Sequence, residues 1–115
     1  MKIKFKIQRI NWSLELVDAL ELDHDDTQSL GETYYADYKI KIVNIDNYSV
    51  LKSALIHELT HAVRWTYGHI SSIDIAGWPS EEVEEQIANT VEVHGEEIIN
   101  LAYEILDKLG RKKDE

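Results

Sequence analysis

The sequence predicts an α+β domain, in which a small antiparallel sheet of three to four strands precedes two helices. Two observations predict this class. Before residue 45 apolar and polar residues alternate with a period of two, whereas after residue 47 apolar residues recur every three or four positions. Strands therefore come first and helices second, and this order is typical of α+β domains.

Three or four strands are expected in the first part of the chain. The first lies at 2–8, where isoleucine and phenylalanine alternate with lysine. A second lies at about 12–17, and a hairpin through 9–11, where no glycine fixes the turn type, can join the two. A further strand covers about 38–44, and residues 31–35 can form a short partner for it.

Two long helices are expected in the second part. The first covers about 48–67, with Asn47 or Ser49 as its N-terminal cap. The second starts at Ser80, where glutamates in the first turns suit the positive end of the helix dipole. Its apolar stripe predicts one long helix, or two that break near His94-Gly95.

Length and composition predict one globular domain. A chain of 115 residues has no room for a second hydrophobic core, and residues 110–115 are expected to be a frayed tail. The absence of cysteine excludes disulfides and any zinc site that uses thiolates. No apolar run reaches the roughly 18 residues of a membrane span, and the charged N-terminus does not resemble a signal peptide. Together with the lack of cysteine, these features favour a cytoplasmic location.

The charge balance argues against two classes of partner. Net charge is −10, from 22 acidic and 12 basic residues. Binding of nucleic acid relies on clustered basic residues, so no nucleic-acid partner is expected, and no membrane partner either. A protein or peptide substrate remains the expected partner, and the oligomeric state stays open.

Residues His57-Glu58-Leu59-Thr60-His61 form the motif H-E-x-x-H, a signature of zinc hydrolases. In a helix, residues four apart lie one turn apart on the same face, so both imidazoles can reach one Zn²⁺. Glu58 is rotated by about 100° from His57, where its carboxylate can meet an attacking water without binding the metal. The motif therefore predicts Zn²⁺ as cofactor, His57 and His61 as ligands and Glu58 as general base.

A catalytic zinc site needs a third protein ligand, and several residues compete for this position. The metzincin pattern fails, because Arg64 and Tyr67 stand where it requires glycine and histidine. His69 lies just past the helix end, and Asp74 can reach from the following loop. A glutamate from the next helix is favoured because a rigid element would fix its position. The competing glutamates are Glu81, Glu82, Glu84, Glu85 and Glu92.

The segment Glu85-Gln86-Ile87-Ala88-Asn89, read as E-x-x-A-N downstream of H-E-L-x-H, resembles the minimal gluzincin-like metallopeptidases of phages and prophages, akin to the ImmA/IrrE group. The stretches 30–33 and 55–62 are similar to the same small proteins. The resemblance implies a zincin-like fold and Glu85 as the third zinc ligand. This chain departs from the family in its long final helix. Asn89, one turn after Glu85, would lie where a residue that orients a metal ligand is expected.

Several other residues could act near the metal. His94 lies on an apolar stripe, and this pattern favours a hydrogen-bonded core histidine over a catalytic one. An oxyanion donor is usual beside zinc in peptidases, and the sequence does not choose among Tyr34, Tyr35, Tyr67 and His69. The acidic segment 23–27 fits no calcium-binding loop and is interpreted as solvated.

The sequence therefore favours a zinc metallopeptidase. The alternative is a binding or regulatory module that retains zinc only to stabilise its fold, which would help a small chain without disulfides. Glu58 argues against that alternative, because a purely structural site needs no base. An acidic interaction protein without metal is the third hypothesis, and it requires the motif to be a coincidence.

Overall fold

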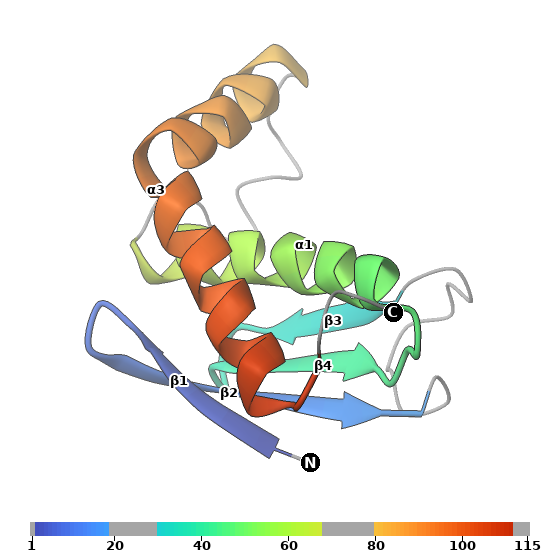
Figure 1. Ribbon diagram of the computed structural model, residues 1–115. Helices are drawn as coiled ribbons and strands as arrows, with labels where there is room; N and C mark the ends of the chain where they lie inside the picture. Colours follow the sequence, from blue (N-terminus) through green and yellow to red (C-terminus); the bar gives the residue numbers. More distant parts are fainter. Residues whose placement is uncertain (1, 19–29, 68–79, 112–115) are drawn as a thin grey trace.

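The computed structural model describes residues 2–18, 30–67 and 80–111, with only the helical backbone described for 80–91. The elements in chain order are β1 (Lys2–Ile7), β2 (Ile10–Val17), β3 (Gly31–Tyr34), β4 (Lys39–Val43), α1 (Tyr48–Thr66) and α3 (Ser80–Lys108). The predicted α+β class is thus confirmed, with strands before helices (Figure 1). Within this part of the chain, no helix has the length and apolar character needed to cross a lipid bilayer.

The sheet is mixed, with strand order β1-β2-β4-β3. Its outer pairs are antiparallel, but β2 and β4 run parallel, so the prediction of a wholly antiparallel sheet is wrong at the central pair. A parallel pair needs a crossover of about a dozen residues or more, and residues 18–38 supply it. β4 takes the interior position because Ile40 and Ile42 are fully buried, whereas β3 has no buried residue.

Two turns adopt backbone conformations that the sequence did not reveal. Gln8 and Arg9 have φ of 50° and 71°, as in the two-residue turn whose twist suits a hairpin, although neither is glycine. Because the turn takes only these residues, β2 starts at Ile10, and the turn is shorter than the predicted 9–11. Tyr38 lies in the β3–β4 turn with φ of 51°, one residue before the strand in which it was expected.

Helix α1 agrees closely with its prediction. Asn47 is the cap, since its Oδ1 accepts a hydrogen bond from the backbone N–H of Val50 at 3.0 Å. The buried stripe of the helix recurs at steps of three and four residues and consists of Leu51, Leu55, Leu59 and Ala62. This stripe faces the sheet and leaves the histidines on another side of the helix.

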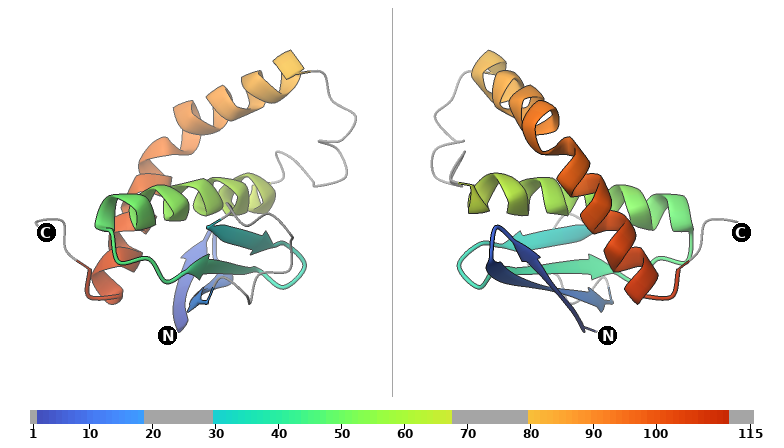
Figure 2. Two further views of the ribbon diagram at one scale, coloured as in Figure 1. Left: turned by 90° about the vertical axis from the view of Figure 1, so that its right-hand side faces the viewer. Right: turned by 60° about the vertical axis from the view of Figure 1, so that its left-hand side comes forward.

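Apolar packing and a hydrogen bond together fix the position of α1 over the sheet. The helix lies across one face of the sheet, above β3 and β4 (Figure 2). Its buried stripe packs into one core with the inward-facing residues of the strands. In addition, the indole Nε1 of Trp12 donates a hydrogen bond to Thr66 Oγ1 at 2.9 Å, which ties the end of α1 to β2. A helix held in this way can present side chains at fixed positions.

Helix α3 is continuous from Ser80 to Lys108, so the predicted long helix is found and the alternative of two helices is not. Its C-terminal half packs against α1 and β1, and its N-terminal half rises away from the sheet (Figures 1 and 2). The buried residues of the C-terminal half complete the core opposite β1, and they include Ile98, Leu101, Ala102, Ile105 and Leu106.

The end of α3 is ordered further than expected. Gly110, with φ of 75°, donates to Asp107 O, and Arg111 donates its backbone N–H to Leu106 O, which together form a Schellman cap. The guanidinium of Arg111 also donates to Ile45 O at 2.8 Å. Gly110 and Arg111, expected in the frayed tail, therefore close the helix and attach it to the segment before α1.

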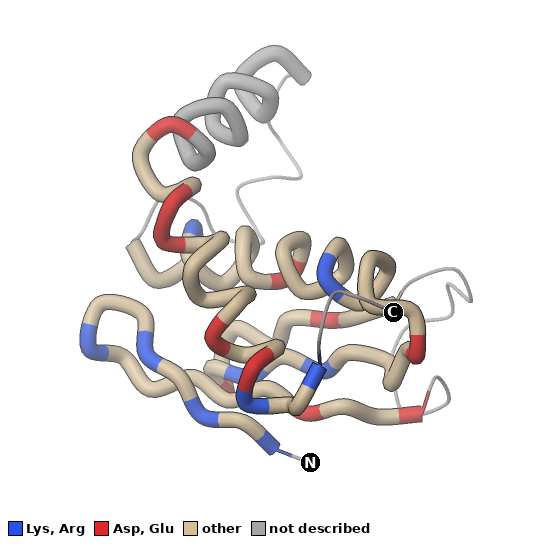
Figure 3. The backbone as a smooth tube through the Cα atoms, in the orientation of Figure 1, with Lys and Arg blue, Asp and Glu red and all other residues tan. Residues whose placement is uncertain are grey.

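The charged residues are distributed unevenly over the sheet. Lys2, Lys4 and Lys6 are exposed and alternate with buried residues along β1, as the sequence pattern predicted. Figure 3 shows the positive charges along this strand in blue. β1 and β3 form opposite edges of the sheet among the described strands. The lysine-rich edge therefore lies at the far side of the sheet from β3.

Candidate metal centre

His57 and His61 lie one turn apart on α1 and their rings converge. The two Nε2 atoms are 3.3 Å apart, and the ring centroids are 4.9 Å apart. In a tetrahedral site with Zn–N bonds of about 2.0–2.1 Å, two ligand nitrogens lie about 3.3–3.4 Å apart. The separation of the two imidazoles therefore fits a pair of ligands on one zinc ion.

The protonation of His61 also fits metal binding. Burial, with smaller contributions from the nearby His57 and Arg64, lowers the pKa of His61 to about 4. His61 is therefore neutral near pH 7, the form whose ring nitrogen has a free lone pair for a metal. The side chain of His57 is 69% exposed, so this candidate ligand is open to solvent.

Glu58 is buried beside the histidines, with only 6% of the residue exposed. Its Oε1 accepts a hydrogen bond from Thr33 Oγ1 at 2.7 Å, while its Oε2 lies 3.9 Å from His57 Nε2. A buried carboxylate is costly without a donor, and Thr33 provides one. One oxygen is thus anchored to β3, and the other lies near the nitrogen pair.

Strand β3 faces α1 at every second residue. Thr33 bonds to Glu58, and a Cβ built on Gly31 would lie 2.9 Å from Glu58 Cγ and 3.1 Å from Lys41 O. Only glycine allows this approach, because any other residue would press on the Glu58 side chain. Gly31 and Thr33, which lie on the same face of β3, therefore both lie against the Glu58 side chain.

Tyr35 follows β3 on the same alternation. Its pKa is raised, mainly by burial and then by the negative charge of Glu58, while the positive charge of Arg64 opposes the rise. Tyr35 therefore remains a protonated hydrogen-bond donor in the surroundings of Glu58. Its ring packs on Trp65, with centroids 4.8 Å apart.

The other two described tyrosines considered as oxyanion donors are engaged elsewhere. Tyr34 donates from its hydroxyl to Glu32 Oε1 at 2.9 Å. Tyr67 donates to Glu97 on α3 at 3.1 Å. Of the three tyrosines, the structure thus brings Tyr35 near Glu58, and His69 lies outside the described residues.

His94 is a packed residue of the interface between α1 and α3. It is 9% exposed, stacks on Tyr67 with centroids 4.2 Å apart, and places Nδ1 3.6 Å from Glu97 Oε1. These contacts agree with the expected role as a core histidine held by polar neighbours.

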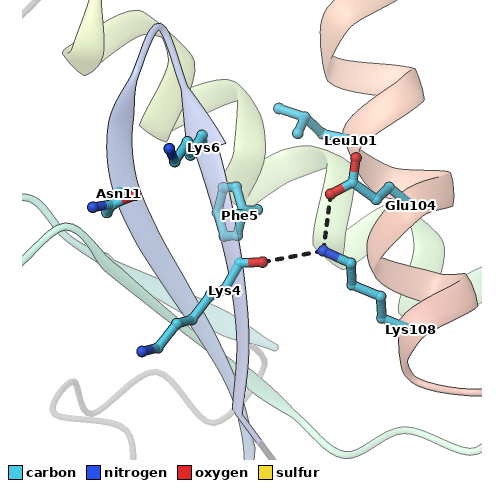
Figure 4. A pocket seen from close by; sticks show the side chains of 7 residues that line it. All are labelled: Lys4, Phe5, Lys6, Asn11, Leu101, Glu104 and Lys108. Carbon is cyan, nitrogen blue, oxygen red and sulfur yellow. Dashed lines mark hydrogen bonds and ion pairs between the residues drawn. The ribbon is translucent and has the colours of Figure 1, made fainter.

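One pocket contains the histidine pair, and another lies elsewhere in the molecule. One of about 350 Å³ is lined by six described residues, all on α1: Ser53, Ile56, His57, Thr60, His61 and Arg64. Another of about 490 Å³ lies between β1 and the C-terminal half of α3 (Figure 4). There Lys108 Nζ donates to Lys4 O at 3.3 Å and pairs with Glu104 at 3.1 Å, so the lining groups stabilise the edge strand.

The third ligand is not found among the described side chains. Within them, no third His, Asp or Glu joins the histidine pair in a group that could hold a metal ion. Glu92, one of the five competing glutamates, is exposed and belongs to no such group. Glu85 lies in the N-terminal half of α3, but its side chain is outside the described part. The same holds for the side chains of Glu81, Glu82 and Glu84, and residues 23–27, His69 and Asp74 are wholly outside it.

Three residues of the site were not recognised in the sequence. Gly31 and Thr33 appeared only within a predicted strand and within the stretch 30–33 of the resemblance, without a role of their own, and Arg64 only as a mismatch to the metzincin pattern. Arg64 is 3% exposed and lines the same pocket as the histidines. Its position three residues after His61, on the same side of the helix, is a local signal that could have revealed it.

Comparisons with protein-family models, with curated proteins and with solved structures gave no match. The candidate function is therefore inferred from the side chains of this chain alone.

Proposed function

We propose that this protein is a zinc-dependent metallopeptidase of the zincin type. The observation that supports this most strongly is the pair of Nε2 atoms 3.3 Å apart, beside a buried glutamate that β3 holds in place. When bound, Zn²⁺ would lower the pKa of a water toward about 7 and polarise the carbonyl of the scissile peptide bond.

The residues of the chain have separate roles in this proposal. His57 and His61 hold the metal through their Nε2 atoms. Glu58 accepts a proton at its carboxylate from the attacking water and delivers it to the leaving amine. Thr33 keeps the carboxylate oriented through its hydroxyl, which lies 2.7 Å from Oε1. Tyr35, protonated near Glu58, is the proposed donor to the developing oxyanion.

Metal binding is the direct test of this proposal. Metal-free protein titrated with zinc is expected to bind about one ion per chain and to melt at a higher temperature, because a ligand that binds only the folded state stabilises it. Failure to bind zinc under these conditions would leave the proposed function without its cofactor.

The third ligand can be identified by a set of matched substitutions. Glu85→Gln is expected to reduce zinc affinity by orders of magnitude and to remove the zinc-dependent rise in melting temperature. A glutamate that only interacts with the helix dipole contributes about 0.3–1 kcal/mol whether or not zinc is present. Glu81→Gln, Glu82→Gln and Glu84→Gln serve as controls in the same titrations and melts. A large zinc-linked loss in Glu81→Gln instead would move the ligand one turn earlier, and a loss in none would favour Asp74.

Thr33→Val tests the support of the base. Valine keeps the shape of threonine but removes the hydroxyl, so the ionised form of Glu58 loses a hydrogen bond and its pKa rises. The acid limb of the kcat profile is then expected to move to higher pH, with zinc affinity nearly unchanged. The profile is measured on a quenched-fluorescence peptide library, with Thr33→Ser as the variant that retains the hydroxyl. An acid limb at the wild-type position in Thr33→Val would contradict this role.

Gly31→Ala tests the close fit between β3 and the base. The new methyl would lie 2.9 Å from Glu58 Cγ, so the carboxylate must move. Displacement of a catalytic group by about 1 Å costs on the order of 100-fold in rate, so kcat is expected to fall strongly while zinc still binds. Wild-type kcat in this variant would show that the position of Glu58 tolerates the added methyl group.

A further inference from the structure

Arg64 is a buried cation without a matching anion in the described part of the chain. The residue is 3% exposed, and neither Nε nor Nη2 has a hydrogen-bond partner there. A guanidinium cannot lose its charge at ordinary pH, and burial of an unpaired charge is strongly unfavourable. Such a group is normally retained where a negatively charged partner offsets the cost.

The two atoms without partners form one edge of the guanidinium. On this edge the N–H groups of Nε and Nη2 point in the same direction, with the spacing of the two oxygens of a carboxylate. A carboxylate would satisfy both donors at once. A carbonyl oxygen would satisfy the edge less well, because it offers one oxygen instead of two.

The location of Arg64 relates this residue to the candidate site. Arg64 follows His61 by three residues, which is about 4.5 Å along the helix axis, and lines the same pocket of about 350 Å³. A group bound by Arg64 would therefore lie in the same pocket as a peptide bond held at the histidine pair.

The net charge of the chain strengthens the case for a selective role. At a net charge of −10 the protein as a whole repels acidic peptides. A single buried arginine at the pocket would reverse this repulsion locally, and only for a carboxylate in the correct position.

We propose that Arg64 binds a carboxylate of the peptide substrate in the pocket that it shares with His57 and His61. This inference rests on the proposed function, because it takes a peptide as the ligand. The carboxylate is either the terminal α-carboxylate of the peptide or the side chain of Asp or Glu next to the scissile bond. Both sources have the same chemistry, and the experiment separates them.

The test measures binding to the metal-free protein, so that it does not depend on catalysis. Two pairs of peptides are titrated by NMR: acetyl-Ala-Ala-Ala with a free carboxylate against its amide, and acetyl-Ala-Glu-Ala-amide against acetyl-Ala-Gln-Ala-amide. Charge-assisted hydrogen bonds predict that the acidic member of one pair binds roughly 10- to 100-fold more tightly. The pair that shows the difference identifies the source of the carboxylate. Equal binding within both pairs would overturn the proposal.

Substitutions of Arg64 assign the preference to this residue. Arg64→Met, which keeps most of the aliphatic stem, is expected to abolish the difference, and Arg64→Lys to retain only part of it because lysine lacks the planar fork. Arg9→Met removes the same charge from the β1–β2 turn and should leave the preference intact. An equal loss in Arg9→Met would mean that net charge, and not Arg64, produces the preference.

Melting of the metal-free variants tests whether Arg64 already has an acidic partner within the chain. If Arg64 awaits a ligand, Arg64→Met removes an unpaired buried charge and should melt at the wild-type temperature or higher. A fall of more than about 5 °C would indicate that an acidic residue of the chain already binds the guanidinium, and would overturn the proposal. Failure of the proposed function is distinguished from this result, because it would appear as absent zinc binding in the wild-type protein.

Discussion

Glu58→Gln is expected to abolish peptide hydrolysis and to leave the metal centre in place. The amide of glutamine cannot accept the proton of the attacking water, and loss of a general base typically costs about 10²–10⁴ in rate. The substitution is conservative for the fold, because the amide oxygen can still accept the hydrogen bond that Thr33 donates to Oε1. The histidine nitrogens are not altered, so zinc affinity should change little.

The measurement compares kcat and bound zinc in the same preparations. Glu104→Gln provides the matched control, since Glu104 pairs with Lys108 on the exposed side of α3 and lines the other pocket. This control should retain full activity. Turnover at the wild-type rate by Glu58→Gln would exclude the proposed mechanism. Loss of zinc from this variant would instead indicate that Glu58 is a ligand or a structural support of the site.

His57→Ala and His61→Ala are expected to remove most of the bound zinc. Each substitution deletes one of the two nitrogens that lie 3.3 Å apart. Residues that only support a ligand contribute about 10- to 100-fold to metal affinity, so the loss of a ligand should exceed this range. The metal-free proteins should also differ from each other, because His57 is exposed whereas His61 is partly buried. We therefore expect His61→Ala to be the less stable of the two.

Elemental analysis and zinc titration check this expectation, with His94→Ala as the control. His94 is buried against Tyr67, so its substitution should lower stability without lowering zinc affinity. Full zinc occupancy in both His57→Ala and His61→Ala would place the metal elsewhere or show that the motif is a coincidence. Zinc binding with no hydrolysis by the wild-type protein would instead favour the alternative of a structural zinc site.

The parts of the structure that the sequence predicted correctly depend on local interactions. Strand β1 follows from the alternation of apolar residues with lysine, and α1 follows from an apolar stripe with Asn47 as its cap. The histidine pair is predictable for the same reason. His57 and His61 lie within a single helix, so the pitch of the helix alone brings their rings together.

Tertiary structure decided how these elements meet. Next to β2, strand β4 lies inside the sheet and buries its Ile40 and Ile42. The period-two pattern of β4 would be the same in either strand direction, so the sequence does not reveal that the pair is parallel. The contact between Thr33 and Glu58 joins residues 25 positions apart. The close approach that requires glycine at position 31 exists only because α1 packs against β3 there. The sequence by itself thus determined the strands, the helices and the histidine pair, because these follow from the backbone period of one segment. Only the fold decided how Glu58 is held and that Arg64 is buried, because burial and hydrogen bonding depend on segments that are distant in the chain.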